Sequence, residues 1–204
     1  MLQIKMLEFK QNFFKMLNKL RQFLFRQNVQ KYLADYPREK VFVNYNRART
    51  VLLLFESHYS EKNTETRKII ESLTADAKKV VAIGYVQKRK IISPIYPEFR
   101  IMYPGDTDLF EKPKKNIIDE VRNQEFDLLI DITRQDWLPL SYIVLFANAK
   151  CKTGMKKKNV DLYDFVVDID NYLIDNEVQI EDLPFSLLYE QINFYLKNIQ
   201  TTDY

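Results

Sequence analysis

The hydrophobic pattern of the chain changes near Arg49. Before this point, apolar side chains recur at helical spacing with basic residues between them. They are Phe9, Phe13, Met16, Leu17, Leu20 and Leu24. The spacing predicts an amphipathic helix over about residues 5–33, which ends before Pro37. After Arg49, short apolar runs alternate with segments of helical period.

The apolar runs predict strands. Three are continuous and of strand length, as expected for strands buried on both faces: "TVLLLFE" (50–56), "KVVAIGYV" (79–86) and "FDLLIDI" (126–132). Shorter strands are expected at 98–103, 150–154 and 163–169. Helical periods between the strands predict helices at 63–77, 112–124, 136–149 and 181–200.

Prolines stand near the expected starts of three helices. Pro113, Pro139 and Pro184 would each occupy a first turn, where proline is tolerated, and Asp136 would cap its helix. Strands that alternate with helices imply parallel pairing with right-handed crossovers. We therefore predict a Rossmann-like, doubly wound, mostly parallel sheet of five to six strands in an α/β domain at 38–204. A long basic amphipathic helical arm at 1–37 precedes it.

The composition limits the kinds of binding site that the chain can form. Three glycines are too few for the usual phosphate-binding loops, and one cysteine with one histidine excludes the usual type of zinc site. We expect no metal and no cofactor. The single cysteine, Cys151, excludes an intramolecular disulfide and indicates a reducing compartment. No apolar run reaches the roughly 20 residues that span a bilayer. Lysines also interrupt any signal-peptide core, so we expect a cytoplasmic protein.

Charge is unevenly distributed along the chain. Residues 1–49 hold 11 basic and three acidic side chains, a balance of +8, whereas the remaining residues hold 20 basic and 25 acidic ones. The basic character therefore belongs to the helical arm. A split of this kind indicates an anionic partner.

One stretch resembles a known family. Within residues 116–155, "FDLLIDI" and "AKCKTGM" stand where the N-terminal half of heptosyltransferase-like glycosyltransferases of the GT-B architecture carries similar strands, and Asp127, Asp131 and Gly154 match. The resemblance implies a Rossmann-like fold. The Gly-Asp pair that supplies the base in those enzymes is missing from "FESHYSEKN", and no second nucleotide-binding domain follows. As a whole, the chain resembles an uncharacterised single-domain bacterial family.

Ligands of open α/β sheets bind beyond the carboxyl ends of the strands. Glu56 and His58 follow the first predicted strand, and Asp131 and Arg134 follow the fourth. An acid there can bind a hydroxyl-bearing ligand, and an arginine can hold a phosphate or carboxylate. The alternative is structural, with His58 in a polar loop and Arg134 paired locally. These four residues are the candidate ligand-binding site, and we assign no catalytic residue.

Two charged stretches carry weaker signals. Asp168 and Asp170 alternate in a way that can bind a divalent metal, but the glycine and spacing of a calcium loop are missing, which favours a solvated acidic connection. Lys156, Lys157 and Lys158 form a basic run without an accompanying nucleic-acid motif, so we do not expect nucleic acid as a partner.

The first hypothesis for function is therefore non-enzymatic: a Rossmann-like binding or scaffold module that docks through its basic helix. Residues 1–33 would contact an anionic membrane surface, at the inner face of the membrane, or a protein partner, and a homodimer is the further option. The docking residues would be Phe9, Phe13, Lys15, Leu17, Lys19, Leu20 and Arg21. Alternatively, the apolar face of the helix covers its own sheet. The second hypothesis is a degenerate glycosyltransferase-like enzyme or a sugar-nucleotide binder.

Overall fold

The computed structural model describes residues 2–57, 63–87, 99–157 and 162–199. Within the first ten residues it describes the side chains of Met6 and Phe9. The strands are β1 (Thr50–Glu56), β2 (Lys79–Tyr85), β3 (Phe99–Met102), β4 (Phe126–Asp131), β5 (Ala149–Met155) and β6 (Phe165–Val167). They form one sheet in the order β3-β2-β1-β4-β5-β6, and every pairing is parallel. The predicted Rossmann-like α/β fold is confirmed.

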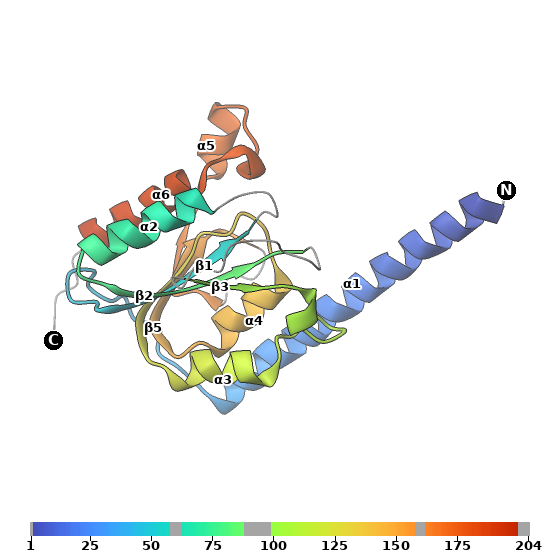
Figure 1. The fold of residues 1–204 in the computed structure, drawn as a ribbon, viewed down its shortest axis with the longest axis horizontal. Helices are drawn as coiled ribbons and strands as arrows, with labels where there is room; N and C mark the ends of the chain where they lie inside the picture. The colour runs from blue at the N-terminus through green and yellow to red at the C-terminus, as the bar shows by residue number, and fades with distance from the viewer. Residues whose placement is uncertain (1, 58–62, 88–98, 158–161, 200–204) are drawn as a thin grey trace.

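Helices cover both faces of this sheet. They are α1 (Leu2–Asp35), α2 (Thr64–Ala75), α3 (Lys115–Asn123), α4 (Leu138–Phe146), α5 (Asp170–Asp175) and α6 (Phe185–Asn198). Helices α2 and α6 lie on one face, whereas α3, α4 and the second half of α1 lie on the other (Figure 1). A hydrophobic core lies on each face of the sheet, and strand β1 contributes to both. Its Leu52 and Leu54 point to the α4 side, and its Leu53 and Phe55 point to the α2 side.

Helix α1 is divided between two environments. Its second half packs on α4: Phe25 is fully buried and meets the Tyr142 ring edge-on at 4.7 Å, and Tyr32 meets Phe146 at 5.0 Å. Its first half extends beyond the α/β body, by which we mean the sheet with α2–α6 (Figure 1). Arg21 stands at the transition, where its guanidinium donates to Glu111.

Two helices, α3 and α6, begin at least three residues later than predicted. Pro113 forms an isolated bridge with Thr107, so α3 starts only at Lys115 and the proline lies outside it. Pro184 occupies the N-cap of α6 with an extended backbone, not its first turn.

The predicted cap at Asp136 is wrong. The N-cap of α4 is Trp137, which makes no side-chain cap bond. Trp137 is extended there, and its indole donates to Glu56. The acidic connection after β6 also contains a short helix, α5, that the charge pattern did not predict.

Gly84 in β2 marks the tightest point of the sheet. A Cβ there would lie 2.6 Å from Cζ of Phe55 and 2.8 Å from Cδ1 of Ile101, on the two neighbouring strands. Non-bonded carbon atoms do not approach so closely, so a larger residue would force Phe55 and Ile101 away from Gly84.

We expect Gly84→Ala to lower the free energy of unfolding by about 1–3 kcal/mol, since overpacking a filled core costs that much. Urea denaturation of the full chain measures it. Gly105→Ala is the matched control, because its Cβ would meet only the exposed ring of Tyr103, at 3.0 Å. Equal losses in the two variants would contradict the packing argument.

Candidate functional site

The carboxyl ends of β1 and β4 bring together two predicted residues. Glu56 Oε1 accepts a hydrogen bond from Arg134 Nε at 2.5 Å, and Glu56 Oε2 accepts one from the indole of Trp137 at 2.5 Å. The Glu56 side chain is 4% exposed and that of Arg134 is 11% exposed. Arg134 also donates to the carbonyls of Glu181 and Leu183, just before α6. The pair therefore ties the sheet edge to the start of α6.

Asp131 is the centre of a second network at the same edge. Its Oδ1 accepts from the backbone and hydroxyl of Thr133, and its Oδ2 accepts from Lys157 Nζ at 2.7 Å and Tyr163 OH at 2.5 Å. The Asp131 side chain is 3% exposed and Lys157 6%. Both carboxylate oxygens thus have protein partners, which is the usual condition for a buried carboxylate.

His58, the fourth predicted ligand residue, lies outside the described residues. Ser57 before it is buried, and its hydroxyl donates to Asn63 at 3.0 Å. The structure thus brings Glu56 and Arg134 into contact and places Asp131 at the same edge in a network of its own.

A cavity of about 440 Å³ lies beside this edge, beneath α1. Asn18 and Arg21 of α1 line it, together with Tyr85, Glu111 and Trp137. Glu56, Asp131 and Arg134 do not. Arg21 and Glu111, at 2.7 Å, pair with each other in its wall. The predicted ligand residues therefore do not line this cavity; they connect the ends of the strands to the segments that follow.

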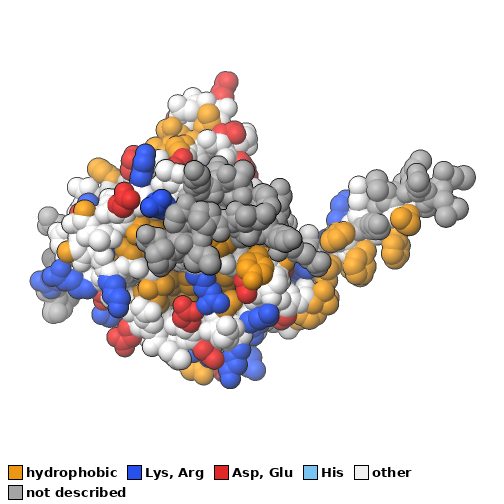
Figure 2. Space-filling view, viewed as in Figure 1, with side chains coloured by type: hydrophobic (Ala, Val, Ile, Leu, Met, Phe, Trp, Pro, Cys, Tyr) orange, Lys and Arg blue, Asp and Glu red, His pale blue; other side chains and the backbone are white. Residues whose placement is uncertain are grey.

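Most of the predicted docking residues on α1 are exposed. Phe9 is 71% exposed, Phe13 48% and Leu20 43%, and Figure 2 shows apolar side chains along the projecting helix. Lys15 and Lys19 are exposed and Leu17 is half-buried. Arg21 differs, because it contacts the body through Glu111 and the carbonyl of Leu109.

An apolar stripe on the same helix contains residues beyond those predicted. Met6, Phe9, Phe13, Met16, Leu20 and Phe23 follow one another at alternating intervals of three and four residues, and all are exposed. This spacing places them on one side of a helix. The side that packs on the body carries Phe25, Asn28 and Tyr32 instead. The apolar stripe of α1 is therefore not the surface that covers its own sheet.

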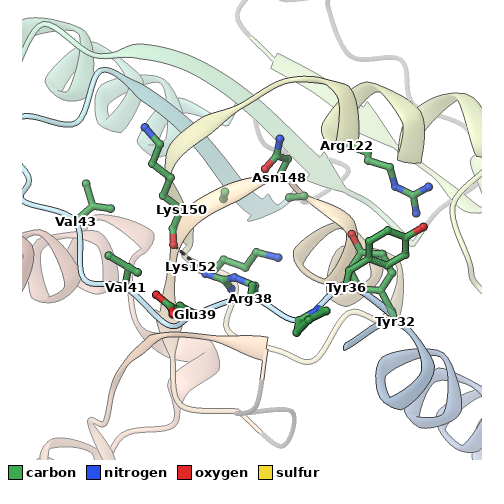
Figure 3. Close-up of a pocket in the computed structure, with 13 residues that line it drawn as sticks. Tyr32, Tyr36, Arg38, Glu39, Val41, Val43, Arg122, Asn148, Lys150 and Lys152 are labelled. Atoms are coloured by element: carbon green, nitrogen blue, oxygen red, sulfur yellow. Dashed lines mark hydrogen bonds between the residues drawn. The ribbon is translucent and has the colours of Figure 1, made fainter. Parts of the chain in front are cut away.

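A feature that the sequence analysis missed lies at the opposite edge of the sheet. A groove of about 560 Å³ opens between the end of α1, the end of α3 and the start of β5 (Figure 3). Arg38, Arg122, Lys150 and Lys152 line it. The available signal was Lys152, a charge in the middle of a strand that otherwise reads as buried.

Lys152 has a structural partner. Its side chain is buried, and its Nζ donates to the carbonyls of Val144 at 2.6 Å and Leu145 at 3.3 Å, in the last turn of α4. Such carbonyls lack partners within their own helix. Burial, with a smaller contribution from the charge of Arg38, lowers the pKa of Lys152 to about 7.

The chain belongs to DUF6913, a family of unknown function, whose model matches residues 21–199. The match begins at Arg21, whose guanidinium bonds to Glu111 of the body. No curated protein and no solved structure matches the chain. The resemblance of residues 116–155 to glycosyltransferases is not shown and stays a prediction. Among the described helices, none is long and apolar enough to cross a membrane.

We expect Asp131→Asn to destabilise the fold by about 3 kcal/mol, because it leaves the buried ammonium of Lys157 without a carboxylate. Chemical denaturation at neutral pH measures the change. Asp168→Asn is the matched control: Asp168 also pairs with a lysine, Lys156, but both are about half exposed, so we expect little change. If Asp131→Asn were as stable as the control, the hydrogen bonds of Asp131 would not stabilise the carboxyl edge of the sheet.

Proposed function

We propose that the protein is a non-enzymatic docking module whose projecting half of α1 binds an anionic membrane surface. The observation that carries the proposal is the exposed apolar stripe on a helix that its own body leaves uncovered. Large aromatic side chains beside basic ones are typical of helices that lie in the membrane interface.

The charge of the helix favours an anionic surface over a second copy. Residues 1–31 contain seven basic side chains and one acidic one, Glu8. Two such helices paired along the stripe would bring like charges together. Near anionic lipid, each basic side chain contributes on the order of 1 kcal/mol. Together with partial burial of the aromatic rings, this is enough for reversible binding.

The state of the carboxyl edge supports a non-enzymatic role. A sugar-nucleotide binder would use Glu56, Asp131 and Arg134, but each of these engages another part of the chain. A ligand that took their place would have to break buried charge pairs, which costs several kcal/mol. We therefore favour docking over the glycosyltransferase-like alternative.

We expect the full chain to co-sediment with vesicles that contain phosphatidylserine and not with phosphatidylcholine vesicles, and salt should weaken the binding. The double variants Phe9→Ser with Phe13→Ser and Lys15→Glu with Lys19→Glu should each reduce binding at least tenfold, because they remove the apolar and the electrostatic contributions separately.

Phe194→Ser and Lys68→Glu are the matched controls, since both side chains are exposed on helices of the body. They should leave binding unchanged. If the chain bound neither kind of vesicle, the proposal would be overturned. So would a stable oligomer in sedimentation that Phe13→Ser dissociates, because the stripe would then belong to a second copy.

A further inference from the structure

The groove at the amino edge of the sheet has a shape that suits a small ligand. Its volume of about 560 Å³ falls within the range of small-molecule sites. Figure 3 shows the two tyrosines on one side of the groove and Lys150 on the other, with Arg38 and Lys152 between them. It lies at the opposite ends of the strands from Glu56 and Asp131, so it is independent of the closed networks there.

One wall of the groove is aromatic. The rings of Tyr32 and Tyr36, one turn apart on and just after α1, lie 4.9 Å apart at an angle of 33°. The ring of Phe146 packs edge-on against the ring of Tyr32, with 5.0 Å between their centres, while Tyr36 is 61% exposed. An exposed ring that is held by a second ring offers a face on which a planar ligand can stack.

The groove also offers guanidinium donors. Arg122 lies over the rings of Tyr32 and Phe146, at 5.7 Å and 5.1 Å, and pairs with no carboxylate among the described residues. Arg38 bonds to Asp164 and to the carbonyl of Lys150 through Nη2 alone, so within the described part of the chain its Nε and Nη1 make no hydrogen bond. Arg122 can therefore hold a phosphate by two parallel hydrogen bonds. The Nε and Nη1 donors of Arg38 point to different sides of its guanidinium, so Arg38 can add one bond, and its charge is already balanced by Asp164.

The other charges in the groove refine the ligand class. Lys150 lies 2.7 Å from Asp127, so it adds little net charge, and Lys152 is engaged by the end of α4. Glu39 is exposed at the rim, where a carboxylate would repel a second phosphate but can accept hydrogen bonds from sugar hydroxyls. The balance of charges favours a ligand with one phosphate, one planar ring and hydroxyl groups.

We propose that this groove binds a nucleoside monophosphate. The base stacks on Tyr36, Arg122 holds the phosphate with one further bond from Arg38, and Glu39 accepts from the ribose. The site goes beyond the proposed docking function, because it uses no residue of the projecting stripe of α1.

Calorimetric titration of the full chain with adenosine monophosphate, adenosine and inorganic phosphate tests the site. We expect the monophosphate to bind at least tenfold more tightly than either fragment, because only it fills both the ring and the phosphate positions. Arg122→Gln and Tyr36→Ala should each weaken binding at least tenfold, whereas Tyr36→Phe, which keeps the ring, should bind like the unaltered protein. Both positions are exposed, so we expect the variants to fold, and circular dichroism checks that they do.

Lys68→Gln is the control for general charge, since Lys68 is exposed on α2, on the other face of the sheet. Three results would each overturn the proposal: no binding of the monophosphate, equal binding of inorganic phosphate, or equal weakening by Lys68→Gln. Vesicle binding by Arg122→Gln should be unchanged, so failure of this site and failure of the docking function are distinguishable.

Discussion

The burial of α4 is the constraint that decides how α1 and α3 pack on the sheet. All nine of its residues are buried, and a helix that is apolar on every side needs a partner on every side. The sheet covers one side, and α3 and the second half of α1 cover the other. Phe25 and Tyr142 fix α1 on that surface. Because α1 is much longer than α4, its first half extends past the body (Figure 1). The apolar stripe on that half is therefore uncovered.

The two edges of the sheet consequently differ in whether their charged side chains are paired within the chain or line a groove. At the carboxyl edge, Glu56–Arg134 and Asp131–Lys157 join the strand ends to the segments that follow, and buried pairs of this kind hold one arrangement of the chain. At the amino edge, α1 ends and the chain crosses in front of β5, which leaves a groove with guanidinium donors. Both proposed binding surfaces therefore involve α1, one along its outer face and one at its end.

The sequence predicted the sheet well and the sites poorly, for physical reasons. β1 begins and ends as predicted, because a fully buried strand is a continuous apolar run with polar residues at both ends. The late start of α4 depends on the contact of Trp137 with Glu56, which are distant in the chain. The sequence did contain one usable signal: the segment "LPLSYIVLF" has no polar face, so a further helix must cover it. The amino-edge groove draws on residues from 32 to 152, so no local motif could have marked it.

Hydrogen exchange followed by mass spectrometry on the full chain tests the division of α1 most directly. A helix without tertiary packing frays, whereas one held in a core exchanges only as that core opens. The account predicts fast exchange over residues 9–20 in buffer, slow exchange over residues 25–35, and new protection of residues 9–20 when vesicles containing phosphatidylserine are added. Equal, slow exchange along both halves of the helix in buffer would contradict it, because the stripe would then already be covered.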